Sequence, residues 1–326
     1  MPQSFKILVR RFGGLGPGNH RIRIAHKTQR GVFLRGTAEN VLPELKTCGF
    51  DDGINLVFSS PPFPLNTKKR YGNLNGQDYV DWLAAFAPKL VDLLTPTGSI
   101  VLEMGNAWEP GRPVMSTLAL KALLAFLEEG KLQLCQQFVW CNPAKLPTPA
   151  QWVNVERIRV KDAFTHLWWM SPRQRPKASN RRILKDYSAA MRELLKRQTY
   201  NSGRRPSQHH IGETSFLTNN RGAIPSNVLT CANTQSSCNY LRYCRSHNIA
   251  PHPARMPLDV ARFFIKFLTL KGDVVLDPFG GSNVTGAAAE SLGRQWISIE
   301  RKKEYIRASV ARFTPVIAAP QLNGRH

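Results

Sequence analysis

The feature that most constrains the fold is a series of short apolar runs separated by segments of helical periodicity. The runs have the length of buried strands and lie at 32–34, 54–58, 99–104, 138–140, 167–170, 274–276 and 296–299. Helical patterns at 79–94, 117–129 and 259–270 lie between several of them. Because parallel strands are buried on both faces and need helical crossovers, this alternation predicts an α/β fold with a mostly parallel sheet.

The alternation is interrupted once. The chain has 326 residues and is 42 % hydrophobic, enough for one large core that carries an insert. Between residues 171 and 250 the sequence is rich in Asn, Ser, Arg and Gln, with one helical pattern near 186–197. We therefore predict a sheet domain in two halves, 31–170 and 251–326, with an insert at 171–250. Residues 1–30 combine glycines and arginines without a signal-peptide core, which predicts a flexible basic arm.

The charge is strongly positive. The 45 Lys and Arg residues outnumber the 22 Asp and Glu residues, which leaves a net charge of +23. The excess is concentrated in residues 1–35, which lack acids, and in residues 173–205 of the insert. Such patches attract polyanions, because each neutralised phosphate releases counterions. We expect a nucleic acid as partner. The alternatives are a basic surface that is only solvated and an anionic membrane as partner. The candidate contacts are Arg181, Arg182, Arg204 and Arg205.

Membrane insertion and metal binding are not expected. No apolar run reaches the roughly 18 residues of a membrane span, and a cytoplasmic location is expected. The six cysteines form no C-x-x-C pair, as is typical of reduced thiols. Cys231, Cys238 and Cys244 lie near His247 and His252, but their spacing fits no common zinc pattern.

The segment 274–300 has the pattern of a cofactor site. It contains a strand, the turn Asp277-Pro278-Phe279-Gly280-Gly281-Ser282, a helix and a second strand that ends at Glu300. Such a turn presents helix N–H groups to a ligand, and the acid can accept hydrogen bonds from ribose hydroxyls. The glycines do not follow G-x-G-x-x-G, and proline and phenylalanine occupy the turn, which favours a nucleoside cofactor without phosphate. The alternative is an ordinary turn that binds no ligand.

A second candidate site follows the run at 54–58. In Ser60-Pro61-Pro62-Phe63 the prolines lack N–H groups, so the carbonyls of Ser60 and Pro61 are held outward as acceptors. The serine hydroxyl adds another acceptor, and Phe63 offers a flat face to a base. This arrangement suits the exocyclic amine of cytosine or adenine. By the rule for parallel sheets, both turns should face one crevice. The alternative is a proline turn with a buried phenylalanine.

Together the two sites resemble the S-adenosylmethionine-dependent amino-group DNA methyltransferases. Ser60-Pro61-Pro62-Phe63 is similar to their catalytic signature in its N4-cytosine form, and the turn at 277–282 and HPARMP at 252–257 are similar to their cofactor motifs. The resemblance covers the chain from about residue 31 to residue 313. The motif order is that of the circularly permuted beta group, which includes the PvuII methyltransferase. It implies a Rossmann-like sheet, mostly parallel with one antiparallel strand, and a small DNA-recognition insert.

The resemblance also implies roles for individual residues. Glu300 would hold the ribose of S-adenosyl-L-methionine, and Phe279 would pack beside it. Ser60 and Pro61 would accept from the cytosine amine during in-line attack, with Phe63 stacked on the extruded base. The methionine end of the cofactor would be surrounded by His252, Pro253 and Ala254. One departure is Gly36-Thr37, where many relatives have Gly-Asp, so any contact of that acid with the adenine end is reassigned or lost here.

The implied function is N4-cytosine methylation of double-stranded DNA, on the nucleoid in a bacterium. Two alternatives stay open: an N6-adenine enzyme, which more often has Asp in place of Ser60, and a DNA-binding protein without turnover. The chain contains no Pro-Cys pair, which C5-cytosine enzymes typically carry. A separate cognate restriction endonuclease is compatible with this function, and so is a solitary methyltransferase.

Overall fold

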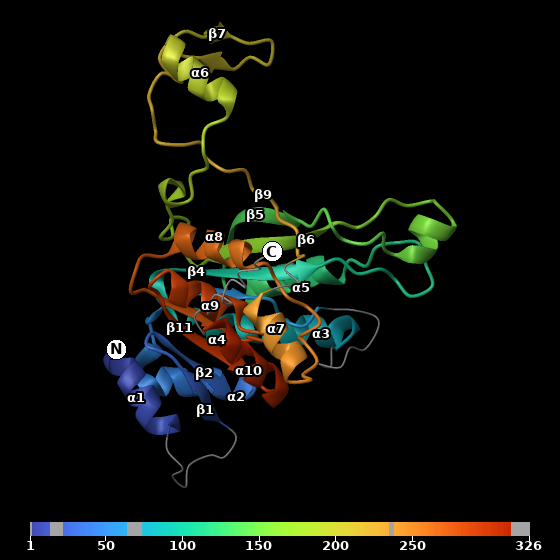
Figure 1. The fold of residues 1–326 in the computed structure, drawn as a ribbon, viewed down its shortest axis with the longest axis vertical. Coiled ribbons are helices and arrows are strands. Elements are labelled where there is room, and N and C mark those ends of the chain that lie inside the picture. Colours follow the sequence, from blue (N-terminus) through green and yellow to red (C-terminus); the bar gives the residue numbers. More distant parts are fainter. Residues whose placement is uncertain (1, 14–21, 64–73, 235–237, 314–326) are drawn as a thin grey trace, which may run out of the picture.

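The main body of the protein is one nine-stranded sheet (Figure 1). A computed structural model describes residues 2–13, 22–63, 74–234 and 238–313. The strand order is β1-β2-β11-β10-β3-β4-β6-β5-β9. The strands are β1 (Arg23–Lys27), β2 (Gly31–Arg35), β3 (Ile54–Ser59), β4 (Leu94–Gly105), β5 (Gln133–Cys141), β6 (Phe164–Ser171), β9 (Val228–Thr230), β10 (Val274–Asp277) and β11 (Gln295–Glu300).

The α/β prediction is confirmed, and each of the seven predicted apolar runs lies in a strand. Strands β2, β11, β10, β3 and β4 are parallel neighbours. Strand β6 runs antiparallel to both β4 and β5, which is the one reversed strand expected within the sheet. Strand β1 adds a second reversed strand at the edge, beside β2. Because β3 pairs with β10, the two halves of the chain meet at the centre of the sheet.

Helices cover both faces of the sheet, and β3 illustrates why. Its Val57 belongs to one apolar cluster, and Leu56 and Phe58 belong to the other, as the two-residue period of a strand requires. The first cluster includes side chains of α1 to α5, and the second includes side chains of α8 and α9. The α-helices are α1 (Gln3–Phe12), α2 (Ala38–Leu45), α3 (Gly76–Ala84), α4 (Phe86–Val91), α5 (Leu118–Glu129), α6 (Ala189–Arg197), α7 (Asn239–Ser246), α8 (Leu258–Leu268), α9 (Val284–Ser291) and α10 (Lys303–Ser309).

The N-terminal segment differs from the flexible arm that we expected at 1–30. Residues 3–12 form α1, and the side chains of Phe5 and Leu8 are fully buried. The ring of Phe5 packs edge-on against Phe50, with 5.2 Å between centroids. Three apolar residues at helical spacing, completed by Phe12, anchor α1 although arginines surround them. The prediction was wrong for residues 2–13 and 22–30; residues 1 and 14–21 lie outside the described part.

The insert is shorter than the predicted 171–250. Its α6 and the small hairpin of β7 (Gly203–Arg204) and β8 (His210–Ile211) form a lobe beyond the β5–β9 edge (Figure 1, top). At residue 228 the chain returns to the main sheet as β9, which pairs with β5. The following α7 packs against α10 through Tyr240 and Cys244. Residues 228–234 and 238–250 therefore belong to the body of the protein.

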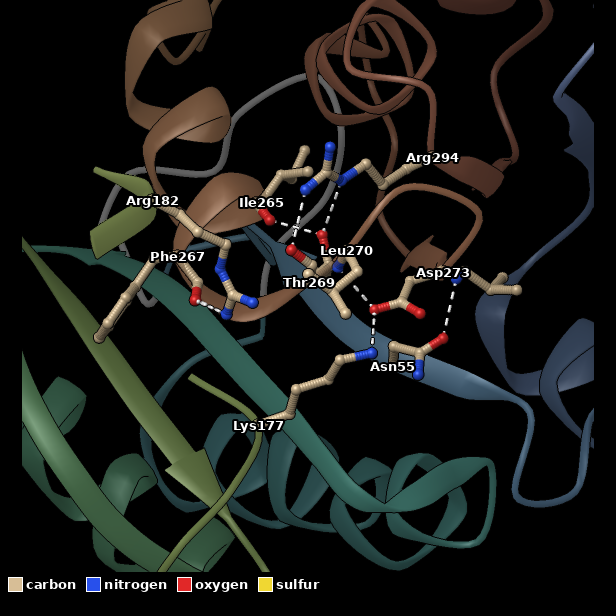
Figure 2. A network of polar contacts seen from close by, with 10 residues as sticks. Asn55, Lys177, Arg182, Ile265, Phe267, Thr269, Leu270, Asp273 and Arg294 are labelled. Atoms are coloured by element: carbon tan, nitrogen blue, oxygen red, sulfur yellow. Dashed lines mark hydrogen bonds and ion pairs between the residues drawn. The ribbon is translucent and has the colours of Figure 1, made fainter. Parts of the chain in front are cut away.

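A polar network fixes the base of the insert to the start of β10, the end of this strand that lies away from the turn at 277–282 (Figure 2). The carboxylate of Asp273 accepts from the ammonium of Lys177 at 2.6 Å and from the backbone N–H of Leu270 at 2.7 Å. The guanidinium of Arg182 donates to the carbonyl of Phe267 at 2.6 Å. Arg182 was predicted to contact DNA; in the structure its side chain holds the insert against the end of α8.

Within the described residues, no helix is long and apolar enough to cross a membrane. The same part of the chain contains no group of three or more His, Cys, Asp or Glu side chains that could hold a metal ion.

Candidate active site

A cavity of about 1080 Å³ opens where β3, β10, β11 and β4 end. The two predicted turns lie on its wall, although more than 200 residues separate them in the sequence. This proximity confirms the expectation that both turns face one crevice. The predicted site residues that line the cavity are Ser60, Pro61, Pro62, Phe63, His252, Pro253, Ala254, Asp277, Pro278, Phe279, Gly280, Gly281, Ser282 and Glu300.

The turn after β3 is held by contacts at both of its ends. The hydroxyl of Ser59 donates to the carboxylate of Asp277 at 2.6 Å, which ties this turn to the turn after β10. Pro61 is buried, and the ring of Phe63 lies against Gly105 at the end of β4. A Cβ atom at Gly105 would be 2.6 Å from Cε2 of Phe63, so a glycine is needed beneath the ring.

Glu103 is a site residue that the sequence analysis missed. It lies in β4 and lines the cavity together with Ser60, whose hydroxyl is close enough to lower the pKa of Glu103. Thr165 of β6 also donates to it, at 3.4 Å. Burial raises the pKa of Glu103 to about 7, and the hydrogen bonds from Ser60 and Thr165 oppose that rise. An acid within the apolar run at 99–104 was the available signal.

The turn after β10 is shaped by backbone hydrogen bonds. The buried carboxylate of Asp277 accepts from the N–H of Phe279 at 3.1 Å, and burial raises the pKa of Asp277. Asn283, with a left-handed φ of 57°, caps α9 by accepting from the N–H of Gly286 at 3.1 Å. A Cβ atom at Gly280 would lie 3.0 Å from the ring of Phe33. The turn therefore approaches the sheet more closely than a larger residue would allow.

Glu300, at the end of β11, lines the cavity beside the turn that follows β10. One carboxylate oxygen accepts from the N–H of Gly281 at 3.0 Å, and the other accepts from the N–H of Lys302 at 2.7 Å. Burial raises the pKa of Glu300, and these backbone hydrogen bonds oppose the rise. Because each carboxylate oxygen has two lone pairs, the carboxylate retains capacity to accept from a ligand in the cavity.

An aromatic wall lies beside this carboxylate. The ring of Phe279 contacts Trp82 and Phe86, with centroid separations of 5.5 and 5.4 Å. The indole N–H of Trp82 donates to the carboxylate of Glu39 at 3.0 Å. Burial alone would raise the pKa of Glu39, but its hydrogen bonds, that from Trp82 foremost, lower it overall. Glu39 lies two residues after Thr37, so the segment that lacks the expected Asp still brings an acid to the cavity wall.

The segment that contains His252 faces the turn from the other side. The backbone N–H of His252 donates to the hydroxyl of Tyr240 at 2.8 Å, and its ring packs edge-on against Tyr305. Burial lowers the pKa of His252 to about 4, so the ring is neutral at physiological pH. Arg312 connects both segments, because it stacks over Tyr240 and donates to the hydroxyl of Ser282 at 3.0 Å.

The arginines predicted to bind DNA lie away from this cavity. Arg181 and Arg204 are exposed, and Arg205 donates to the carbonyl of Asn201 within the lobe. None of the four lines the cavity, and Arg182 has the structural contact described above.

Comparisons with known proteins agree with this geometry. A sequence family described as DNA methylase matches residues 54–311. The Type II methyltransferase M.PvuII of Proteus hauseri is 42 % identical over 89 % of this chain and 85 % of its own length. The Type II methyltransferase M.HpaI of Haemophilus parainfluenzae is 25 % identical over 81 % of this chain and 69 % of its own. The solved PvuII DNA methyltransferase, described as cytosine-N4-specific, superimposes with a TM-score of 0.72 at 36 % identity and covers 91 % of this chain and 90 % of that one. The chain therefore belongs to the DNA methylase family.

Proposed function

We propose that this protein is a site-specific DNA methyltransferase that moves a methyl group from S-adenosyl-L-methionine to the N4 amine of a cytosine flipped out of duplex DNA. The observation that carries the proposal is the shared cavity of Ser60-Pro61-Pro62-Phe63 and the turn that ends at Ser282. Hydrogen-bond acceptors for an amine and a binding site for a nucleoside cofactor therefore lie in the same cavity. The similar PvuII enzyme, described as cytosine-N4-specific, supports the choice of base.

The cavity wall fits this cofactor better than one that carries phosphate. Five carboxyl groups, those of Glu39, Glu103, Asp162, Asp277 and Glu300, line the cavity against three basic side chains, those of Lys145, Arg255 and Arg301. A pyrophosphate would be repelled by these carboxyl groups, whereas a positively charged sulfonium is compatible with them. The retained lone pairs of Glu300 suit two ribose hydroxyls, and Phe279 offers an apolar face. When bound, the cofactor supplies an electrophilic methyl group.

Ser60, Pro61 and Phe63 would act on the target base. Phe63 stacks on the flipped cytosine, and the Ser60 hydroxyl and the Pro61 carbonyl accept from its amine. The cofactor would supply its methyl group to in-line attack by this nitrogen, and the nitrogen would have to lose one proton. That proton can pass through Ser60 to Glu103, whose pKa of about 7 suits a general base near neutral pH.

Duplex DNA is held, in this proposal, by the basic lobe above the sheet. Arg204 and Arg205 of the lobe and Arg181 at the base of the insert are the candidate phosphate contacts, and the net charge of +23 supports a polyanionic partner. We assign residues 172–227 to target recognition, with the catalytic and cofactor halves of the body on either side in sequence. A DNA substrate implies a cytoplasmic site of action, and a separate endonuclease that reads the same target would be a functional partner.

The test is to incubate the protein with duplex DNA and labelled S-adenosyl-L-methionine, digest the DNA, and separate the nucleosides by mass spectrometry. We expect label in N4-methylcytosine. Label in N6-methyladenine would retain the reaction and refute the choice of base. Absence of label despite salt-sensitive DNA binding would indicate a DNA-binding protein without turnover.

A further inference from the structure

Two loops at the cavity edge of the sheet join into one projecting arm. The first, residues 106–117, follows β4, and the second, residues 142–163, connects β5 to β6 (Figure 1, right). The rings of Trp108 and Trp152 contact each other across the loops, with 5.3 Å between centroids. The guanidinium of Arg159 donates to the carbonyl of Pro113 at 3.1 Å, and the amide of Asn106 donates to Asp162 at 2.8 Å. The loops thus support each other.

This arm carries the most exposed large apolar side chains of the described residues. Val160 is 86 % exposed, Leu146 is 77 % exposed and Val155 is 69 % exposed. Leu146 differs from the other two in its surroundings, because Lys145, Thr148 and Pro149 on either side of it line the cavity. Leu146 is therefore placed at the rim of the cavity, where a macromolecule whose group occupies the cavity would meet it.

The loop that presents Leu146 is fixed in place. The ammonium of Lys161 donates to the carbonyls of Pro143 and Lys145, at 3.2 and 3.4 Å. The N–H of Lys145 donates to the carbonyl of Asn142 at 3.1 Å, and the carbonyl of Thr148 accepts from the N–H of Asp162 at 3.0 Å. Because these bonds already order the loop, inserting Leu146 into a partner would cost little conformational entropy.

We propose that Leu146 is a wedge that enters the DNA base stack beside the target nucleotide and stabilises its extruded state. This inference rests on the proposed function, since it requires a base to occupy the cavity. Extrusion leaves a gap in the stack, and an apolar side chain can occupy it, as apolar wedges do in other DNA-bending proteins. The occupant is duplex DNA, because the ammonium of Lys161 reaches the carbonyl of Lys145 next to Leu146 and forms no ion pair with a described acid, so its charge can complement a phosphate, whereas Lys145 pairs with Asp162 at 3.7 Å.

The experiment compares single-turnover methyl transfer on two duplexes that carry the target site found by sequencing. In one duplex the target cytosine is paired with guanine, and in the other it lies opposite an abasic site, where extrusion costs less. The variant is Leu146→Ser. The matched control is Val155→Ser, on the same arm but among residues that do not line the cavity.

For Leu146→Ser we expect a rate about tenfold lower on the paired duplex and within about twofold of the parent protein on the abasic duplex. Val155→Ser should stay within about twofold on both. An unchanged rate on the paired duplex, or an equal loss on both duplexes, would overturn the wedge. A change of oligomeric state in the Leu146→Ser variant, measured by sedimentation, would also overturn the wedge if it accounted for the loss of rate. Leu146 would then contact a second copy of the chain. If the parent protein methylates neither duplex, the proposed function itself fails.

Discussion

The hydroxyl of Ser60 lies close enough to the carboxyl group of Glu103, a residue that is 4 % exposed, to lower its pKa. An ionised carboxylate can only accept, so in any hydrogen bond between them the hydroxyl is the donor. The lone pairs of Ser60 are then available to accept from an amine in the cavity. A protonated Glu103 would not impose this orientation. The ionised form of one buried acid therefore favours Ser60 as an acceptor.

Methyl transfer should depend on pH through Glu103. The pKa of this carboxyl is raised to about 7, so the ionised form is lost as the pH falls below neutrality. We expect the single-turnover rate at saturating cofactor and DNA to fall below pH 7 and to level off above pH 8. His252 does not titrate in this range, because its pKa is lowered to about 4. A rate that is flat from pH 6 to pH 8 would contradict the role of Glu103.

Glu103→Gln should separate activity from stability. The folded-state pKa of Glu103 lies above its ordinary value of 4.5, so its contribution to stability is full below about pH 4.5 and is lost as the pH rises through about 7. The neutral amide avoids this loss. We expect the variant to be more stable than the parent at pH 8, by at most about 3 kcal/mol, and similar at pH 4. The rate of methyl transfer by the variant should be low and should depend little on pH. Urea unfolding at pH 4 and pH 8 tests the predicted difference in stability.

The sequence was sufficient to locate both turns of the site. Ser60-Pro61-Pro62-Phe63 and the turn from Asp277 each follow an apolar run, and parallel strands bring such turns to one edge. Glu103 could not be located in this way, since its proximity to Ser60 depends on the pairing of β3 with β4. Leu146 was missed for a related reason: its loop has no periodicity, and its position at the cavity depends on contacts with the neighbouring loop.

Two errors in the fold have separate physical causes. In α1 the apolar spacing of Phe5, Leu8 and Phe12 was present, but the surrounding basic residues and glycines favoured an arm. Strand β9 has three residues, of which Leu229 alone is buried, so its sequence has no clear strand signal. Its structure comes from pairing with the edge of β5. The secondary structure of both segments is therefore determined by tertiary contacts.

Gly105→Ala should displace the ring of Phe63. The new Cβ atom would lie 2.6 Å from the ring, beside the backbone of β4, so the ring must move away. We expect a loss of about 1–3 kcal/mol in the free energy of unfolding and a slower single-turnover rate, because the face that stacks on the base has shifted. Adding Phe63→Leu should recover stability but not rate. If Gly105→Ala alone leaves both unchanged, the contact does not position the ring.

Glu300→Gln should weaken cofactor binding. Both carboxylate oxygens accept from backbone N–H groups, so the amide nitrogen of glutamine would face one of these donors and the ligand would lose an acceptor. We expect the dissociation constant of S-adenosyl-L-methionine, measured by calorimetry, to rise by about tenfold or more. DNA binding without cofactor should not change. Glu304→Gln, at an exposed position of α10, is the control, and equal effects of both variants would refute the role of Glu300.

Arg181 and Arg182 are adjacent but should respond differently to replacement by glutamine. Arg181 is exposed at the base of the insert, so Arg181→Gln should weaken DNA binding and reduce the slope of log affinity against log salt by about 1. Arg182 donates to the carbonyl of Phe267, so Arg182→Gln should instead lower the free energy of unfolding by about 1–3 kcal/mol. Fluorescence anisotropy across a salt series and thermal unfolding measure the two quantities. A reduced salt slope in Arg182→Gln with unchanged stability would restore this arginine to the DNA interface and would mean that its contact with α8 contributes little.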